Sequence, residues 1–362
     1  MQSKENAPSP ERMPVVSAAG SPYEVGLTIG RHRQHRIAAR VEAMRERRRS
    51  VGIDDATAYR SAQPYLALTN GLLPDLVVEL AGIADGAGVP FLELFRLNCP
   101  GARLPAESPW LRRRQAQQTP SGGCTSMVSR GPAGVVLGHT EDFAPEWRDD
   151  LYVLQMQTGQ TRICALNYAQ TLAGCAAAVN GAGLVQVIDS LHDRRHPLGI
   201  SAHFLARGVL AHDDIAGAVD FLRRTLPRDG GFNHLLVQGT RIVNVEAGPA
   251  GFAVEEVTAD TYAHTNHYLN VVSKARPEPA ANSLTRRSRA LELLHPAMTV
   301  QDMYGALADR DGYPDSICRD RTIGAFLTDT QNSAVQIAWG QPVPDGATFH
   351  RYHVPSAAAG GP

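Results

Sequence analysis

Chemistry in this sequence concentrates at Cys124, which follows two glycines and precedes the hydroxyl pair Thr125 and Ser126. Glycine has no Cβ to shield its carbonyl carbon and tolerates strained backbone angles, so the thiol of a following cysteine can reach that carbonyl. An N-to-S acyl shift at Gly123–Cys124 would cut the chain and leave Cys124 as a new N-terminus. Such a residue carries a thiol nucleophile and an α-amine with a pKa near ~8 that can serve as its base.

The competing interpretation of Cys124 is a buried small hydrophobic residue at the start of a strand. The flexible loop and glycines before it favour a thiol exposed at the end of a sheet, where a nucleophile is useful. The other four cysteines, Cys99, Cys164, Cys175 and Cys318, have apolar neighbours and no C-x-x-C spacing. An odd number of cysteines with these spacings predicts reduced thiols rather than a disulfide framework.

Glu141 and Asp142 end the second strand of a hairpin predicted across a turn at residues 131–134. Pairing across this turn would return both carboxylates to the side of Cys124. Asp142 could then accept hydrogen bonds from the new α-amine or from Thr125, as the third member of a catalytic triad orients its base. The alternative is a surface carboxylate that terminates a strand.

His264, Asn266 and His267 follow strands predicted at 252–257 and 259–262. The neutral amide of Asn266 suits an oxyanion hole, where one donor can lower a barrier by ~3 kcal/mol. The two histidines could instead bind a metal together with a carboxylate such as Glu141, although no third ligand stands at a helical or hairpin spacing. A third interpretation is that the histidines brace the loop.

Which arginine serves the site stays open between three residues: Arg286, Arg319 and Arg321. An arginine of the segment 316–321 could pair with Asp142 or bind an anionic substrate group, and the alternative is a surface ion pair. Arg286 lies just after Ser283 and Thr285, either of which could cap a helix, so we interpret its segment as a solvated helix start.

The elements that must position these residues change in character at Cys124. Residues 22–98 have helical spacing, with a Ser21-Pro22 start, Asp54-Asp55 capping a segment through Leu66, and Pro74 opening the next helix. A Pro-, Arg- and Gln-rich loop follows up to Gly122. From Cys124 on, short apolar runs joined by tight turns predict hairpins at 125–139, 151–168, 176–188 and 235–246, and strands at 322–329 and 334–339. Helices are predicted at 201–210, 213–226, 285–296 and 300–308. Hairpin sheets that alternate with helix pairs indicate stacked α and β layers.

Composition limits the classes of partner. The chain has 362 residues, 43% of them hydrophobic, and a formal net charge of −1, so nothing favours nucleic acid or an anionic membrane and we expect a small-molecule partner. Its two lysines, Lys4 and Lys274, lie outside any Gly-rich phosphate loop. The first twenty residues contain no apolar run of signal-peptide length, which predicts a cytoplasmic location. Residues 1–13 and the tail from Ser356 to Pro362 are predicted to be disordered.

Taken together, these motifs resemble the acyl-coenzyme A:isopenicillin N acyltransferase family, a group of self-processing N-terminal nucleophile enzymes that also includes N-β-alanyl amine hydrolases. The likeness lies in Gly-Gly-Cys124-Thr-Ser, Gly-x-x-x-Asp142-Phe, His-x-Asn266-His and Ser316-Ile-Cys-Arg319, and in the Ser-Pro-Tyr-Glu-Val-Gly segment near the N-terminus. It covers most of residues 15–342. Glu141 replaces the aromatic residue expected in the penicillin branch and resembles the bacterial and amine-hydrolase side.

The resemblance implies an α+β fold, a four-layer αββα sandwich of the N-terminal nucleophile hydrolase type. It also implies a cut into an α chain, residues 1–123 with a cleavage loop at 101–123, and a β chain, residues 124–362, that carries the sheets and the active site. The two chains would stay together as a heterodimer. Neither metal nor cofactor is needed in this interpretation.

By the same resemblance Cys124 is the nucleophile, its α-amine the base, Asp142 an orienting carboxylate and Asn266 the oxyanion donor, with Arg319 carried over as a further catalytic residue. The residues expected to support the site are Thr125, Ser126, Glu141, His264 and Ser316. We expect an amide bond of a small N-acyl amine or peptide-like metabolite to be opened through an acyl-thioester, the acyl group passing to water.

Three alternatives remain. The first is transfer of the acyl group to an amine, although no coenzyme A phosphate site is evident. The second is a metal-dependent hydrolase that uses His264 and His267. The third is a processed but catalytically idle scaffold protein.

Overall fold

The computed structural model describes residues 12–103, 123–132, 134–191, 193, 196–273, 277–331, 334–343 and 348–355. It confirms the α+β class, with helices and several sheets. Most of the predicted cleavage loop and both terminal tails fall outside the described residues. Met13, predicted to be disordered, is buried in the core between the two large sheets.

The N-terminal third is helical, as its spacing predicted. Its helices are α1 (Pro22–Ser50), α2 (Asp55–Leu72), α3 (Pro74–Ala87) and α4 (Phe91–Asn98), followed by the 3-10 turn η1 (Pro100–Arg103). Ser21 caps α1 in a capping box, because its hydroxyl accepts from the Glu24 amide while the Glu24 carboxylate accepts from the Ser21 amide. The predicted end of α2 at Leu66 was wrong, since the helix continues past Pro64 to Leu72.

Helices α1 and α3 pack unusually close together. A Cβ on Gly26 would lie 2.0 Å from the Glu79 carbonyl oxygen, and one on Gly82 would lie 2.2 Å from the Tyr23 carbonyl oxygen. Only glycine permits this approach of two helix backbones.

The larger sheet has eight strands in the order β1-β4-β5-β6-β7-β10-β11-β12. Their bounds are β1 (Val15–Ala19), β4 (Leu151–Thr158), β5 (Thr161–Tyr168), β6 (Ala177–Asn180), β7 (Val185–Ser190), β10 (Phe232–Gln238), β11 (Arg241–Gly248) and β12 (Gly251–Glu256). The predicted hairpins are present. Strand β1 was missed because it is only five residues long, and it pairs in parallel with β4 from far along the chain.

The second sheet has six strands in the order β13-β2-β3-β14-β15-β16. Their bounds are β2 (Gly123–Gly131), β3 (Gly134–Asp142), β13 (Thr261–His264), β14 (Thr322–Asp329), β15 (Ala334–Ala338) and β16 (Phe349–His353), the last not predicted. Two short strands, β8 (Ile200–Ser201) and β9 (Arg228–Asp229), form a separate pair, also not predicted. The remaining helices are η2 (Pro145–Asp150), α6 (Ala202–Val209), α7 (Ile215–Arg224), α8 (Ala281–Leu293) and α9 (Val300–Leu307).

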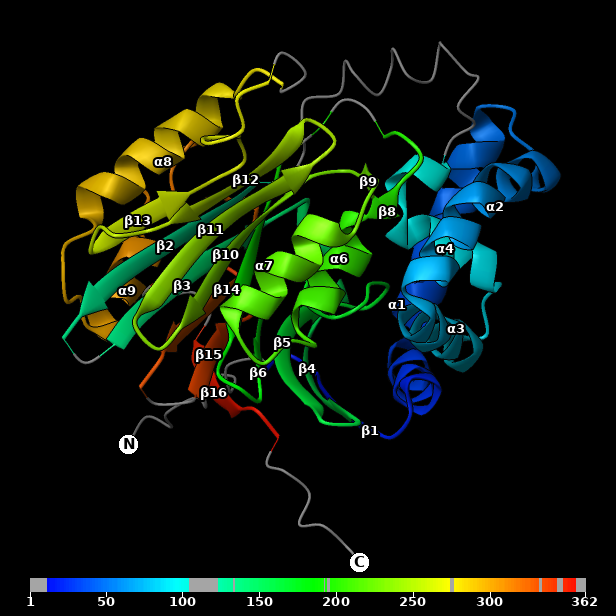
Figure 1. Ribbon diagram of the computed structural model, residues 1–362, viewed down its shortest axis with the longest axis horizontal. Coiled ribbons are helices and arrows are strands. Elements are labelled where there is room, and N and C mark those ends of the chain that lie inside the picture. Colours follow the sequence, from blue (N-terminus) through cyan, green and yellow to red (C-terminus); the bar gives the residue numbers. More distant parts are fainter. Residues whose placement is uncertain are drawn as a thin grey trace, which may run out of the picture.

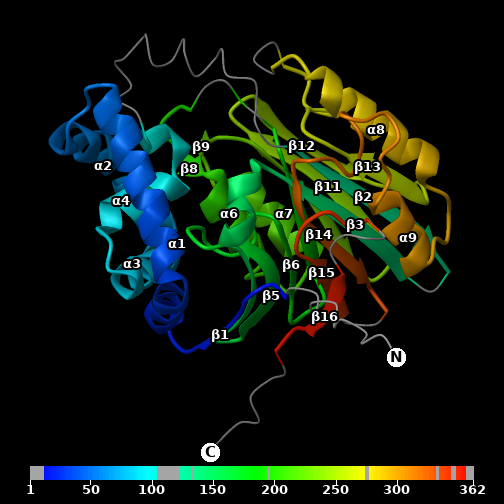
Figure 2. The ribbon, with the colours of Figure 1, turned by 180° about the vertical axis from the view of Figure 1, so that it is seen from behind.

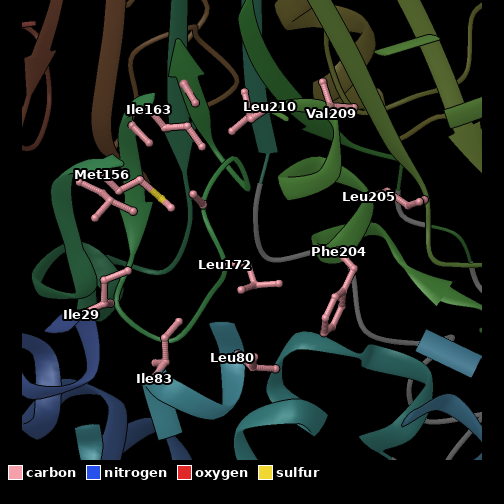
Figure 3. Packing of buried hydrophobic residues seen from close by; sticks show 14 of the residues in the cluster. Ile29, Leu80, Ile83, Met156, Ile163, Leu172, Phe204, Leu205, Val209 and Leu210 are labelled. Carbon is pink, nitrogen blue, oxygen red and sulfur yellow. The ribbon is translucent and has the colours of Figure 1, made fainter. Parts of the chain in front are cut away.

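Three apolar clusters show how these elements pack. One lies between the outer face of the eight-stranded sheet and α1, α3, α4, α6 and α7, and its members include Ile29, Leu80, Met156, Ile163 and Phe204 (Figure 3). A second lies between the two sheets, and a third packs the six-stranded sheet against α8 and α9. Figures 1 and 2 accordingly show α1–α4 and α8–α9 on opposite sides of the molecule, with the sheets between them.

Side chains of successive strand residues point to opposite faces of a sheet. Val128 of β2 and Leu137 of β3 lie in the core between the sheets. Cys124 is four residues before Val128 on the same strand, so its side chain faces the same side, between the sheets. No helix within the described part of the chain is long and apolar enough to cross a membrane.

Candidate active site

Cys124 lies at the start of β2, directly opposite Glu141 of β3, and Gly123 lies opposite Asp142. The hairpin therefore returns both carboxylates beside the cysteine, as predicted. The expectation of an exposed thiol was wrong, because Cys124 is only 6% exposed and faces the space between the sheets. The other four cysteines are buried too, and all five are free.

Asn266 holds the backbone nitrogen of Cys124. The Cys124 nitrogen donates to Asn266 Oδ1 at 2.9 Å, and Asn266 Nδ2 donates to the Ser190 carbonyl at 3.1 Å. The oxygen rather than the amide donor of Asn266 thus faces the cysteine, and the donor already has a partner. The oxyanion role of Asn266 stays a prediction that would require this donor to be shared.

Ser283 fixes the loop that carries Asn266. Its hydroxyl accepts from the Asn266 amide at 2.8 Å and donates to Thr265 Oγ1 at 2.9 Å. Helix α8 begins at Ala281, with Ala280 at the N-cap and no side-chain cap. The interpretation of Ser283 or Thr285 as a helix cap was therefore wrong, and Ser283 is a buried positioning residue.

Arg286, interpreted as part of a solvated helix start, is fully buried at the centre of the site. Its Nη1 donates to the Cys124 carbonyl at 2.5 Å and to Thr125 Oγ1 at 2.9 Å, while Nη2 donates to Asn266 Oδ1 at 2.7 Å. Burial and, to a lesser extent, the charge of Arg319 lower the pKa of Arg286 to about 10, against the opposing effect of Asp142. The guanidinium is still charged at neutral pH.

A sequence signal for Arg286 existed in the periodicity of its helix. Ser283, Arg286 and Ala290 are the buried residues of α8, at positions i, i+3 and i+7. An arginine on the same helical face as small residues is a candidate for burial.

Asp142 is 1% exposed, so the surface alternative was wrong. Arg319 Nε donates to Asp142 Oδ2 at 2.7 Å and Thr322 Oγ1 donates to Asp142 Oδ1 at 2.6 Å. The expected pairing of Asp142 with an arginine from 316–321 is thus present, whereas the expected bonds to Thr125 or the Cys124 nitrogen are not among its contacts. Arg321 contributes its carbonyl, which accepts from the Phe143 amide.

Gly123 is surrounded by these polar groups. A Cβ at this position would lie 2.6 Å from Arg319 Nη2, 2.8 Å from Arg286 Nη2 and 2.9 Å from Asn266 Oδ1. The requirement for glycine therefore comes from the close approach of two guanidinium groups and an amide, in addition to the access of a thiol to the carbonyl.

The thiol lies in different surroundings. Cys124 Sγ is 3.6 Å from Glu141 Oε2, and the Tyr168 hydroxyl donates to Glu141 Oε1 at 2.7 Å. His139 Nε2 lies 3.1 Å from Glu141 Oε2, and its Nδ1 lies 3.0 Å from Ser126 Oγ. Sequence reasoning missed His139 and Tyr168, although the period of two places His139 on the same strand face as Glu141.

Burial raises the pKa of the Cys124 thiol well above its ordinary value, and the charges of Glu141, Asp189 and Asp142 raise it further. The carboxylates disfavour a second negative charge nearby. The thiol of this structure is therefore protonated at neutral pH and needs a base before it can attack.

His264 and His267 face different partners. His264 lies between Glu246 and Asp189, with Nε2 3.3 Å from Glu246 Oε1 and Nδ1 3.4 Å from Asp189 Oδ2. Burial disfavours its charged form, but the two carboxylates outweigh this and raise the pKa of His264. His267 Nδ1 is 2.8 Å from Ser283 Oγ, and burial together with the charge of His264 lowers the pKa of His267 to about 4.

The proposed metal site of His264, His267 and Glu141 is not formed among the described residues. The group there whose side chains come close enough to hold an ion is Cys124, His139 and Glu141, with ligand atoms within 4.8 Å of one another. These atoms already contact one another, and we assign no metal to them. Ser316, expected to support the site, donates to the Cys318 carbonyl at 2.6 Å within its own turn.

Comparison with known proteins shows the family of this chain. Residues 129–344 match the family of acyl-coenzyme A:6-aminopenicillanic acid acyl-transferase. The chain belongs to this family. The matched segment begins after Cys124 and contains Asp142, Asn266, Arg286 and Arg319, so the acyl-transferase family likeness includes the residues around the cysteine but not the cysteine itself.

Two relatives extend the likeness over most of the chain. The β-alanyl-dopamine/carcinine hydrolase of Drosophila melanogaster is 25% identical over 351 residues, which cover 86% of this chain and 87% of that protein. The 40 kDa form of acyl-coenzyme A:6-aminopenicillanic-acid-acyltransferase of Emericella nidulans is 24% identical over 323 residues, 84% of each chain. Enzymes similar to this member of the acyl-transferase family thus include a hydrolase and an acyltransferase.

Proposed function

We propose that this protein is a self-processing amide hydrolase, which cuts itself at Gly123–Cys124 and uses the released Cys124 to open the amide bond of a small N-acyl amine. The observation that carries the proposal is the environment of one residue. The Cys124 nitrogen bonds Asn266, its carbonyl bonds Arg286, and its thiol lies against Glu141. A buried structural cysteine needs partners for its backbone groups, but it needs neither a buried arginine on its carbonyl nor a carboxylate against its thiol.

The geometry supports turnover by an N-terminal cysteine. After cleavage, the nitrogen held by Asn266 Oδ1 becomes an α-amine, whose pKa near ~8 suits a general base. The thiol proton passes to this amine, Sγ bonds to the substrate carbon, and the proton moves on to the leaving amine as the C–N bond breaks. Water then attacks the acyl-thioester, which releases the acid and restores the thiol.

The two positive charges beside Gly123 support stabilisation of the developing oxyanion. Arg286 and Arg319 both bring guanidinium nitrogens to the position next to the carbonyl that precedes Cys124. Fixed donors in a water-poor site stabilise such an oxyanion strongly. Asp142 holds Arg319 in place through a buried ion pair.

We further propose that the arrangement of the clusters is the four-layer αββα sandwich of N-terminal nucleophile hydrolases, with residues 1–123 and 124–362 as the α and β chains. Contacts across the proposed cut would keep these chains together. Strand β1 pairs with β4, Arg36 Nε donates to Asp150 Oδ1 at 2.8 Å, and Arg207 Nη2 donates to Glu79 Oε2 at 2.9 Å. The helical cluster packs directly on the eight-stranded sheet.

Cleavage is tested by a denaturing gel and intact mass of the purified protein. The wild type should give two fragments, one ending at Gly123 and one beginning at Cys124, while Cys124→Ala should remain a single chain. A wild-type chain that stays uncut under mild conditions contradicts the proposal.

The substrate class is tested with N-acyl amines. Because one relative is named for β-alanyl-dopamine, we choose that amide first and follow release of the free amine. Hydrolysis should occur with the cut wild type and not with Cys124→Ala. Adding a second amine separates hydrolysis from transfer, since an acyltransferase, as in the Emericella relative, would yield the new amide.

A further inference from the structure

The uncut chain lacks the base that the mature enzyme would use. Before cleavage the Cys124 nitrogen is part of a peptide bond and donates its hydrogen to Asn266 Oδ1, so it cannot accept the thiol proton. The buried thiol is itself a poor acid in this environment. Self-cleavage therefore needs another proton acceptor next to Sγ.

Three carboxylates, Glu141, Asp189 and Asp142, act on the thiol, and they differ in position and availability. Asp189 forms no hydrogen bond to Sγ in the described part of the chain. Glu141 Oε2 lies 3.6 Å from Cys124 Sγ. Asp142 has an arginine on one oxygen and the Thr322 hydroxyl on the other. Asp142 is therefore occupied by a buried ion pair with an arginine, which suits a fixed structural charge, whereas Glu141 has no arginine partner among the described residues.

We propose that Glu141 is the general base of self-cleavage, accepting the Cys124 thiol proton before the α-amine exists. This inference rests on the proposed self-processing function and adds a residue that acts once, in the precursor. The α-amine takes over as the base after the cut.

Neighbouring strands hold the Glu141 carboxylate in position. Tyr168 of β5 donates to Oε1 at 2.7 Å, and His139 lies 3.1 Å from Oε2 and is itself bonded to Ser126 of β2 at 3.0 Å. All of these side chains are buried. A catalytic group fixed by partners on three strands loses little entropy when it acts.

The step balances within the chain plus one water. Glu141 takes the proton from Sγ, and Sγ bonds to the Gly123 carbonyl carbon. The bond from that carbon to the Cys124 nitrogen breaks as a proton passes to the nitrogen, which returns Glu141 to its ionised form. Water then hydrolyses the Gly123 thioester, leaving a Gly123 carboxylate, a free thiol and a free α-amine.

The test is the rate of cleavage of newly made full-length chain, followed by gel after a pulse of cell-free synthesis. Glu141→Gln keeps the size of the side chain but removes the basic oxygen, and should slow cleavage by about 10²-fold or more. Glu146→Gln makes the same chemical change at an exposed residue and should be cut at the wild-type rate.

Tyr168→Phe provides a second test, with a variant that keeps the Glu141 carboxylate. Tyr168 holds the Glu141 carboxylate in position but is not the proton acceptor, so its removal loosens the base without deleting it. Cleavage should be slower than in the wild type but clearly faster than in Glu141→Gln. A purely structural role for the Glu141 carboxylate predicts that the two variants are cut at similar rates.

The outcomes distinguish a failure of the Glu141 proposal from a failure of the self-processing function. Wild type and Glu141→Gln cut at equal rates would overturn the role of Glu141 while leaving the self-processing function intact, and a folded Tyr168→Phe chain cut no faster than Glu141→Gln would do the same. A wild type that is never cut would overturn the proposed function itself.

Discussion

The two residues of the Gly123–Cys124 pair lie in opposite electrostatic surroundings. The guanidinium groups of Arg286 and Arg319 lie close to Gly123, together with the side-chain amide of Asn266. Around the Cys124 thiol stand Glu141, with His139 and Tyr168 behind it. An acyl shift puts negative charge on the carbonyl oxygen and removes a proton from the thiol, so each side suits the change that it would experience.

The two regions also differ in how their charges are compensated. Arg319 has Asp142 as an ion-pair partner at 2.7 Å. Arg286, in contrast, has hydrogen bonds to the Cys124 carbonyl, Thr125 and Asn266, all neutral acceptors. We therefore expect the two arginines that reach the same glycine to differ in role, with Arg319 more important for stability and Arg286 more important for the reaction at the carbonyl.

The largest expected effect comes from Gly123→Ala. Its methyl group would meet Arg319, Arg286 and Asn266 within 2.9 Å, and these side chains cannot withdraw without losing their hydrogen bonds. We expect loss of self-cleavage and a stability loss of about 1–3 kcal/mol, typical of overpacking. The gel measures the first, and chemical denaturation in a Cys124→Ala background measures the second.

Gly305→Ala is the matched control. Gly305 lies in helix α9, where a Cβ would meet nothing within 4 Å. The substitution should leave cleavage unchanged and raise stability by about 0.5–1 kcal/mol, the helix preference for alanine. Efficient cleavage of the Gly123→Ala chain would show that the side chains around Gly123 can move aside for a methyl group, which would contradict the prediction.

Substitutions of the two arginines should have a smaller effect on cleavage than Gly123→Ala and should differ from each other in stability. Arg319→Gln leaves the buried Asp142 carboxylate without its ion partner, which costs about 3–5 kcal/mol in comparable cases. Arg286→Gln leaves no carboxylate without its ion partner and should therefore cost less stability. It should nevertheless slow cleavage by about 10²-fold, because a fixed hydrogen-bond donor is lost. Cleavage rates and unfolding in the Cys124→Ala background check both. Equal losses of stability in the two variants would contradict the distinction.

The sequence predicted what depends on local pattern. The turn residues at 131–134 and the alternating strands predicted that Asp142 lies beside Cys124, as it does. The predicted pairing of Asp142 with an arginine of residues 316–321 is present as the ion pair with Arg319. Such predictions succeed because a hairpin register follows from its turn and its strand lengths.

Features that depend on contacts between layers could not be predicted. Arg286 reaches Cys124 across the stacking of α8 on the six-stranded sheet, and Tyr168 reaches Glu141 from the opposite sheet. Neither contact has a fixed spacing along the chain. The burial of Cys124 was missed for the same reason, since β7 covers β2 only once the two sheets have packed.

His264 gives the smallest expected effect and extends the comparison to the acidic side. It faces Asp189 and Glu246, which raise the pKa of the folded imidazole above its value of 6.5 in an unfolded chain. A raised pKa stabilises the fold fully below about pH 6.5, and this contribution is lost as the pH rises through the folded pKa. The charged imidazole should therefore contribute more to stability in mild acid than in mild base.

The difference in unfolding free energy between Cys124→Ala and the double variant Cys124→Ala/His264→Gln should accordingly be larger at about pH 6 than at about pH 8. His267, whose pKa is lowered to about 4, is present in both chains, and its own titration cancels in the difference. Denaturant unfolding at the two pH values measures the effect. A difference that is the same at both would mean that the folded imidazole titrates as in the unfolded chain, and a difference that is smaller at about pH 6 would mean that His264 is held neutral between its two carboxylates.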